Sequence, residues 1–132
     1  AVIRRAGPRV WWVAALVGHV VSALLAYASI GVAIALGSDS ADRVADDWDF
    51  GVSCVLASLT GVLFADALGR VRAARRRRAD EGPRAVDVAL LVTTTGALVL
   101  WVATISWYGV EHPLAFALGA AVLVLARRRR TR

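Results

Sequence analysis

The sequence contains no lysine and no methionine, and Cys54 is the single cysteine among its 132 residues. One cysteine excludes an intrachain disulfide, and the CxxC pairs typical of zinc or redox sites are missing too. We therefore expect neither a metal site nor a cofactor. Because the chain opens on Ala1 and already carries arginines there, we expect earlier membrane segments to be missing before it.

Long stretches of mixed polar and apolar residues are also scarce. Apolar residues make up 58% of the chain, and the polar residues are bunched between apolar runs. A bilayer core about 30 Å thick excludes charge over about 20 residues of helix, so this bunching predicts an all-α, polytopic transmembrane helical bundle. The length allows one membrane domain, 1–132. We predict four spans, at 10–36, 50–68, 88–108 and 113–126.

The charge of the chain is predominantly of one sign, with 16 arginines against ten acidic residues. The arginines lie at the ends of apolar runs, which argues against nucleic-acid binding and favours topology signals. Only Arg43, in the acidic loop 37–49, falls on the far side of a four-span arrangement; the other 15 share one side with the basic linker 69–87. The positive-inside rule makes that side cytoplasmic, so we expect both termini of this chain in the cytoplasm and the acidic loop outside.

Ser53 and His112 are the residues most suited to chemistry. Each lies at the outer end of a span that runs from outside to inside, so packing of these spans would bring hydroxyl and imidazole to similar depth. A serine needs a base within about 2.6–3.2 Å to become a nucleophile. The first-turn N–H groups of Ser53 and Cys54 lack intrahelical acceptors and favour a developing oxyanion. A hydroxyl bonded to its own helix is the plain alternative for Ser53.

Small residues predict that these two spans approach closely. Gly51 and Gly61 lie in one span, and Ala115 and Gly119 lie in the other. Such residues at helical spacing form the small-xxx-small face that lets membrane helices come into close contact. We therefore expect the spans 50–68 and 113–126 to pack against each other.

His19 is an ionisable residue within the first span. It lies ten residues after Arg9, or about 15 Å at about 1.5 Å per residue, which places it near mid-membrane. Polar groups at that depth are costly and are weighed individually. His19 is either a buried neutral imidazole, hydrogen-bonded through Ser22 or a backbone carbonyl, or a member of a proton relay or site.

Two short segments, GVSC and HPLAFALG, together resemble the motifs of the rhomboid intramembrane serine proteases. In that family a GxSG motif lies where an outer loop enters a membrane helix, and a later helix carries a histidine with small residues at +3 and +7. Ser53 and His112 match the serine and the histidine, and Gly61 matches a packing glycine eight residues after the serine. The segment RRAGPRVWWVAALVGHVVSALL also resembles rhomboid-like membrane proteins of high-GC Gram-positive bacteria.

The resemblance implies the last four helices of a six-helix core in a bacterial plasma (inner) membrane. It implies a hydrolase in which Ser53 attacks a transmembrane protein substrate and His112 transfers the proton, with no cofactor. The chain departs from the family at several points. Cys54 replaces the glycine after the serine, and Ala57 replaces an aromatic residue that stacks on the imidazole. Glu111 precedes the histidine where a small residue is usual, Pro113 follows it, and the His and Asn that the family's second helix directs toward the oxyanion are not found. The alternative is a catalytically inactive rhomboid-like protein that binds transmembrane partners. The third reading is a small transporter subunit that uses His19.

Overall fold

The computed structural model describes residues 1–45, 52–76, 82–103 and 110–130. Over these ranges the chain is helical and contains no strand, as the sequence predicted. The helices in chain order are α1 (Val2–Ala6), α2 (Pro8–Leu16), η1 (Val17–Val21), α3 (Ser22–Ala35), α4 (Asp39–Ala45), α5 (Ser53–Arg76), α6 (Ala85–Ala103) and α7 (Glu111–Arg130). The element η1 is a π-helical turn that joins α2 and α3 into one continuous helix.

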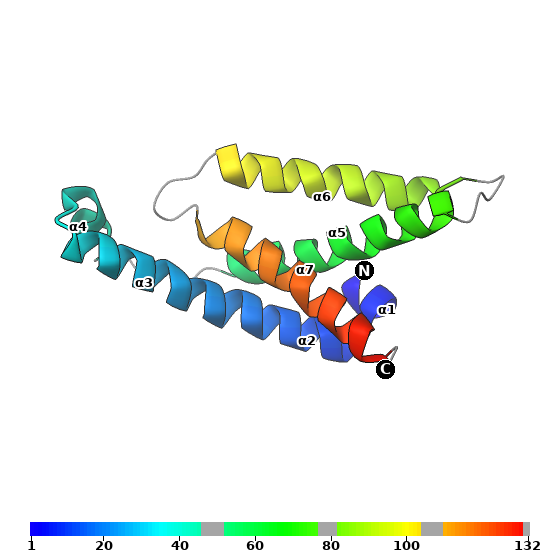
Figure 1. Cartoon of the computed structure of the whole chain (residues 1–132), viewed down its shortest axis with the longest axis horizontal. Coiled ribbons are helices and arrows are strands. Elements are labelled where there is room, and N and C mark those ends of the chain that lie inside the picture. Colours follow the sequence, from blue (N-terminus) through cyan, green and yellow to red (C-terminus); the bar gives the residue numbers. More distant parts are fainter. Residues whose placement is uncertain (46–51, 77–81, 104–109, 131–132) are drawn as a thin grey trace.

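The long helices lie alongside one another and alternate in direction (Figure 1). The continuous helix α2–η1–α3 leads from the end that holds both termini to α4 at the opposite end. Helix α5 returns, α6 runs out again, and α7 returns to end beside α1 and α2. Helices α5 and α7 therefore run in the same direction, and their first turns lie toward the end of the molecule away from the two termini.

Local sequence signals set where the continuous helix begins and ends. Pro8 opens α2, where its missing N–H costs no intrahelical hydrogen bond. Gly37 follows α3 with a φ of 85°, a conformation that glycine adopts without steric penalty. Its N–H donates to the Ile34 carbonyl at 2.8 Å, and the Ser38 N–H donates to the Ala33 carbonyl at 3.0 Å. This pair of bonds is a Schellman motif, which satisfies the last carbonyls of α3 and turns the chain into α4.

Three helices are long and apolar enough to cross a membrane: Pro8–Ala35, Ser53–Arg76 and Ala85–Ala103. Many large apolar side chains lie on the outside of the bundle, such as Leu24 and Val92, each 64% exposed. Extended apolar surface of this kind is unfavourable in water and is the normal exterior of a helix in lipid. The prediction of membrane-length apolar helices is confirmed for these three; the predicted fourth span, 113–126, belongs to α7, which is not one of them.

The helices differ in extent from the predicted spans. Helix α5 continues to Arg76, past the predicted end at 68, so the first part of the predicted linker 69–87 is helical. An ion pair between Arg70 and Asp66, one turn apart, supports this continuation. Helix α6 is described as far as Ala103, and the rest of the predicted span 88–108 lies outside the described residues.

The predicted span 113–126 and the predicted loop 37–49 also contain or adjoin more helix than the sequence indicated. Helix α7 includes the predicted span 113–126 and extends it at both ends, from Glu111 to Arg130. The predicted acidic loop 37–49 contains the short helix α4, Asp39–Ala45. Polar segments that the hydropathy pattern assigns to loops are therefore partly helical, because helix formation depends on backbone hydrogen bonding as well as on apolar burial.

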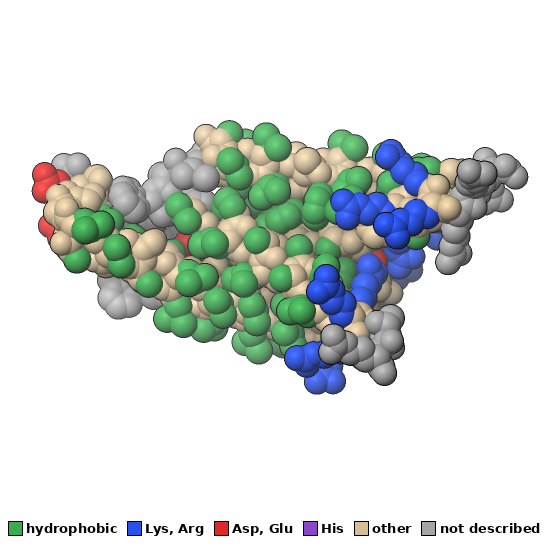
Figure 2. Space-filling view, viewed as in Figure 1, with side chains coloured by type: hydrophobic (Ala, Val, Ile, Leu, Met, Phe, Trp, Pro, Cys, Tyr) green, Lys and Arg blue, Asp and Glu red, His purple; other side chains and the backbone are tan. Residues whose placement is uncertain are grey.

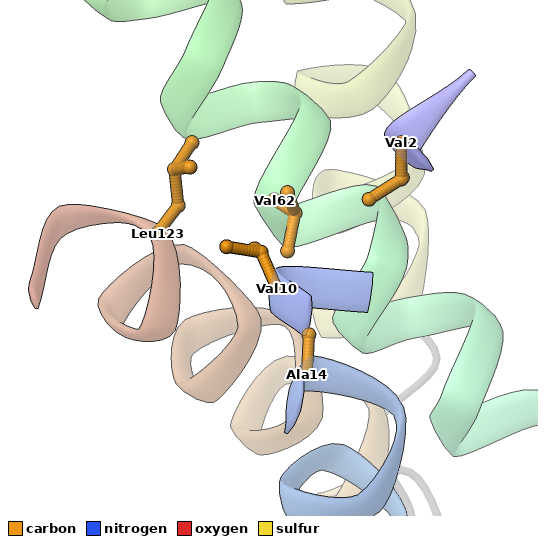
Figure 3. Packing of buried hydrophobic residues seen from close by; sticks show 5 residues of the cluster. All are labelled: Val2, Val10, Ala14, Val62 and Leu123. Atoms are coloured by element: carbon orange, nitrogen blue, oxygen red, sulfur yellow. The ribbon is translucent and has the colours of Figure 1, made fainter. Parts of the chain in front are cut away.

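One apolar core joins α1, α2, α5 and α7. Its buried side chains point toward one another from all four helices (Figure 3), and they are Val2, Val10, Ala14, Val62 and Leu123. Since lipid is as apolar as these side chains, their contribution in a membrane comes from close packing more than from leaving water. The core holds the short α1 against the bundle and thereby positions its arginines.

Arginine side chains gather at one end of the molecule, while acidic side chains of α4 lie at the other end (Figure 2). These gathered arginines come from α1, α2, the second half of α5 and the last turns of α7, which the fold brings together. Arg43 belongs to α4 at the opposite end. The separation of charge that the sequence predicted along the chain is thus present in space.

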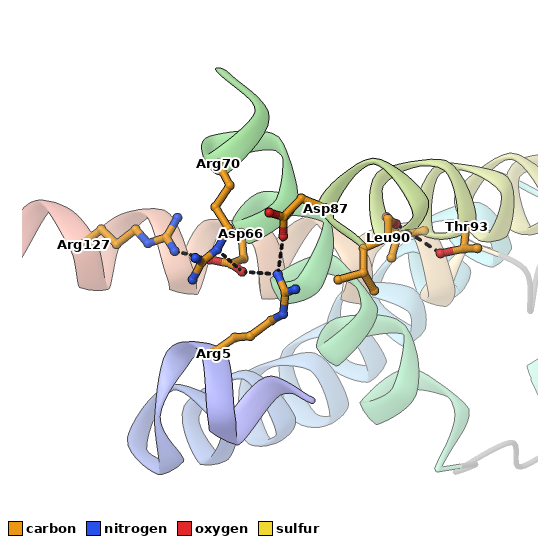
Figure 4. A network of polar contacts seen from close by, with 8 residues as sticks. Arg5, Asp66, Arg70, Asp87, Leu90, Thr93 and Arg127 are labelled. Carbon is orange, nitrogen blue, oxygen red and sulfur yellow. Dashed lines mark hydrogen bonds and ion pairs between the residues drawn. The ribbon is translucent and has the colours of Figure 1, made fainter. Parts of the chain in front are cut away.

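A cluster of ion pairs ties this arginine-rich end together (Figure 4). The Asp66 carboxylate of α5 is fully buried and accepts from Arg5 at 2.9 Å, from Arg70 at 3.0 Å and from Arg127 of α7. Arg5 of α1 also donates to Asp87 of α6 at 2.8 Å. These bonds to Asp87 and Asp66 raise the pKa of the Arg5 guanidinium above its ordinary value. We call these five residues the basic-end cluster; it connects α1, α5, α6 and α7.

Candidate functional site

Helices α5 and α7 are in direct backbone contact. A Cβ added to Gly61 would overlap the Phe116 carbonyl, and a Cβ added to Gly119 would overlap the Ser58 carbonyl. Each glycine therefore faces a carbonyl group of the other helix, an arrangement that allows reciprocal Cα–H···O contacts. Gly61 and Gly119 were both predicted as packing residues from the sequence; Gly51 lies outside the described residues.

The π-turn η1 crosses the α5–α7 pair at the same level. A Cβ on Gly18 would overlap the Ser58 side chain, so the π-turn and α5 also touch closely. The buried Ser58 hydroxyl donates to the Ala14 carbonyl at 2.7 Å, and the buried Ser22 hydroxyl donates to the Gly18 carbonyl. A π-turn disturbs the regular hydrogen-bond ladder, and here two hydroxyl groups supply donors to carbonyls beside it.

The first turns of α5 and α7 are joined by a bond between two buried side chains. Cys54 Sγ donates to Glu111 Oε2 at 3.2 Å, and both residues are buried. Ser53 precedes Cys54 and His112 follows Glu111, so both candidate catalytic residues are chain neighbours of a bonded pair. Successive helical residues differ by about 100° in direction, so they lie beside this bond rather than in it. The structure thus brings Ser53 and His112 to the same end of two adjoining helices.

Trp101 of α6 lies against the same helix ends. Its indole stacks on the His112 imidazole, with ring centroids 5.7 Å apart and 21° between the planes. It also packs against the buried side chains of Cys54, Ala57 and Ala115, all predicted or discussed at this position from the sequence. The sequence places alanine at 57, where the rhomboid motif has an aromatic residue, and a stacking ring is supplied from α6 instead. Aromatic stacking of this kind restricts the imidazole orientation.

The serine and the histidine do not form a bond in this structure. Within the described residues, Ser53 Oγ makes no hydrogen bond to the His112 ring, and both side chains are half-buried. In the first turn of α5, the Leu56 N–H donates to the Val52 carbonyl at 3.1 Å. Ser53 and Cys54 belong to the first turn of α5, where backbone N–H groups point toward the start of the helix. We call Ser53, Cys54, Trp101, Glu111 and His112 the helix mouth.

His19 lies in η1 and is half-buried. Its ring forms no hydrogen bond with any residue of the described ranges, and the hydroxyl of Ser22 donates to Gly18 rather than to His19. Across the same ranges, no group of three or more His, Cys, Asp or Glu side chains is arranged to hold a metal ion. The described neighbours of His19 therefore supply neither a relay of hydrogen bonds nor a ligand set.

Sequence reasoning did not identify Trp101, the bond from Ser58 to the Ala14 carbonyl, or the cross-helix partners of Asp66. A signal was present for Ser58, which lies four residues after Cys54 and three before Gly61, on the face predicted to pack. No such signal existed for Trp101, because its stack on His112 depends on how α6 lies against α5 and α7.

Comparison of the chain with protein-family models, with curated proteins and with solved structures gave no match.

Proposed function

We propose that this chain is the membrane domain of a rhomboid-like intramembrane serine endopeptidase, with Ser53 as nucleophile and His112 as base. The observation that carries the proposal is the parallel backbone contact of α5 and α7, which places both residues at the same end of adjoining helices. In this proposal the 20-residue α7 is the fourth span, and the arginines of its last turn mark the membrane boundary.

The proposed site lies at the outer face of a bacterial plasma membrane. The helix mouth is at the end of α5 and α7 away from the basic-end cluster. By the positive-inside rule the arginine-rich end is cytoplasmic, which puts Ser53 and His112 near the outer leaflet. A transmembrane protein is then the natural substrate, because its peptide bonds reach this depth and water enters from the outer side.

In the proposed reaction, Ser53, His112 and the first-turn N–H groups have different roles. The Ser53 Oγ attacks the scissile carbonyl carbon while its proton passes to His112, and the first-turn N–H groups donate to the oxyanion. His112 then protonates the leaving amine as the C–N bond breaks and an acyl-enzyme forms. Water, deprotonated by His112, cleaves that ester and regenerates Ser53. The Cys54 thiol donates to Glu111 of α7, and Cys54 is only 3% exposed.

A fluorophosphonate probe tests this assignment in the protein purified in detergent. We expect labelling of the wild type, complete loss in Ser53→Ala, and a decrease of about 10²-fold or more in His112→Ala, the size of a typical general-base contribution. Ser29→Ala is the matched control, because the Ser29 hydroxyl donates to the Ala26 carbonyl of its own helix. Labelling that persists in Ser53→Ala, or a folded wild type that is not labelled, would contradict the proposal.

A second candidate function is a catalytically inactive rhomboid-like protein that binds transmembrane partners. The observation that favours it is the His112 ring, which stacks on Trp101 and makes no hydrogen bond to Ser53. On this hypothesis the folded wild type is not labelled, and Ser53→Ala keeps every cellular phenotype of the wild type.

A further inference from the structure

A groove of about 400 Å³ lies between α2 and α7 near the arginine-rich end of the bundle. Its size falls within the range of about 300–1,000 Å³ that is typical of ligand sites. The walls are apolar except for two arginines, and the lining residues are Arg9, Val10, Val13, Val122, Leu125, Ala126 and Arg129. None of these residues belongs to the helix mouth or to the basic-end cluster.

Charge and apolar surface follow the same order on both walls of the groove. On α2, Arg9 comes before Val10 and Val13, and this helix runs away from the arginine-rich end. On α7, which runs toward that end, Val122 comes before Arg129. Each wall therefore carries its arginine at the rim and apolar side chains deeper in the bundle. On α7, Val122 lies seven positions before Arg129, or about 10 Å along the helix at about 1.5 Å per residue.

The two arginines of the groove differ from those of the basic-end cluster. Arg5 and Arg127 are paired with the buried Asp66. In contrast, Arg9 and Arg129 are exposed and form no ion pair with an acidic side chain of the described ranges. The rim of the groove thus carries two positive charges that no described carboxylate neutralises.

We propose that this groove binds an anionic phospholipid, with its phosphate between Arg9 and Arg129 and part of an acyl chain along the apolar walls. Guanidinium groups match phosphate oxygens in geometry and charge, and basic pockets between membrane helices are suited to anionic headgroups. A charged rim followed by an apolar floor has the polarity order of a phospholipid entering from the membrane surface. A free phosphate ion would use the rim alone and would gain nothing from Val13 or Leu125.

The test uses the full chain in detergent micelles supplied with phosphatidylglycerol or phosphatidylcholine, with retained lipid counted by native mass spectrometry. We expect phosphatidylglycerol to be retained in preference to phosphatidylcholine. Arg9→Gln and Arg129→Gln should each weaken that retention about fivefold, which corresponds to about 1 kcal/mol for one arginine near a charged headgroup. Val13→Trp fills the groove without changing the charge and should also reduce retention.

The matched control is the double variant Arg72→Gln/Arg75→Gln, which removes the same charge from exposed arginines of α5 outside the groove. It should retain phosphatidylglycerol as the wild type does. Far-UV circular dichroism checks that every variant is helical. The proposal is overturned if the control loses as much lipid as Arg9→Gln/Arg129→Gln, if Val13→Trp has no effect, or if inorganic phosphate displaces the bound lipid.

Discussion

The two ends of the α5–α7 pair are held together by different kinds of interaction. At the arginine-rich end, one buried carboxylate binds three guanidinium groups, so that long side chains bridge several helices. Between that end and the helix mouth, the two backbones touch through glycines, and at the mouth the Cys54 thiol donates to the Glu111 carboxylate across the helix pair. Charge pairs tolerate some variation in helix separation because arginine side chains are flexible, whereas glycine contacts fix the separation closely. The candidate site lies at the end where the helix spacing is set by backbone contact.

The largest expected effect is at the glycine contact. Gly119→Ala should lower the free energy of unfolding by about 3 kcal/mol, because its Cβ overlaps a backbone carbonyl that has no alternative rotamer. Gly96→Ala in α6 is the control, since a Cβ there meets nothing within 4 Å. Equilibrium unfolding in mixed detergent measures both. Equal stabilities of the two variants would mean that α5 and α7 are not in backbone contact.

A smaller effect is expected at the basic-end cluster. Asp66→Asn removes the charge that three arginines share and should cost about 2 kcal/mol, within the range for hydrogen bonds to charged groups. Asp87→Asn should cost less, because Asp87 has one described partner, Arg5. The same unfolding assay applies. A larger loss in Asp87→Asn than in Asp66→Asn would show that the cluster is centred on α6 instead of α5.

The smallest expected effect is a difference in stability between two variants that each lose one hydroxyl group of α5. Ser58→Ala removes a bond from α5 to the Ala14 carbonyl and should cost about 1 kcal/mol. Thr60→Val removes a bond from Thr60 to the Leu56 carbonyl of the same helix and should change stability by less than about 0.5 kcal/mol. If the two variants unfold alike, the bond from Ser58 of α5 to Ala14 of α2 contributes no measurable stability.

The elements that sequence alone predicted are those set by local composition. Apolar runs predicted the membrane-length helices, and the arginine positions predicted which helix ends lie together. Hydropathy could not predict that α5 continues to Arg76, because that continuation is supported by pairing of Arg70 with Asp66 within a polar segment. Helix ends in polar segments depend on hydrogen bonds that a hydropathy pattern does not contain.

Ser53, Cys54 and His112 of the helix mouth were candidate site residues from the sequence, and their role in catalysis stays a prediction. The spacing of Ser53 and His112 from their helix starts placed both at one level, and the structure has α5 and α7 side by side there. The Trp101 stack and the Cys54–Glu111 bond depend on the rotation of each helix about its axis. A rotation changes which side chains meet without changing the hydrophobic pattern of a helix that is apolar on all sides. For such helices, side-chain pairs follow only from three-dimensional packing.

The position of Asp66 along the chain has a consequence for synthesis. Arg5 precedes it by 61 residues and Arg127 follows it by 61. At about 5–20 residues per second, the ribosome adds Arg127 about 3–12 s after Asp66. Before that point Arg5 and Arg70 are already part of the chain, whereas α7 is not complete. The last of its three ion pairs therefore forms only after α7 has entered the bundle, so completion of the cluster reports that the newly made helices have assembled.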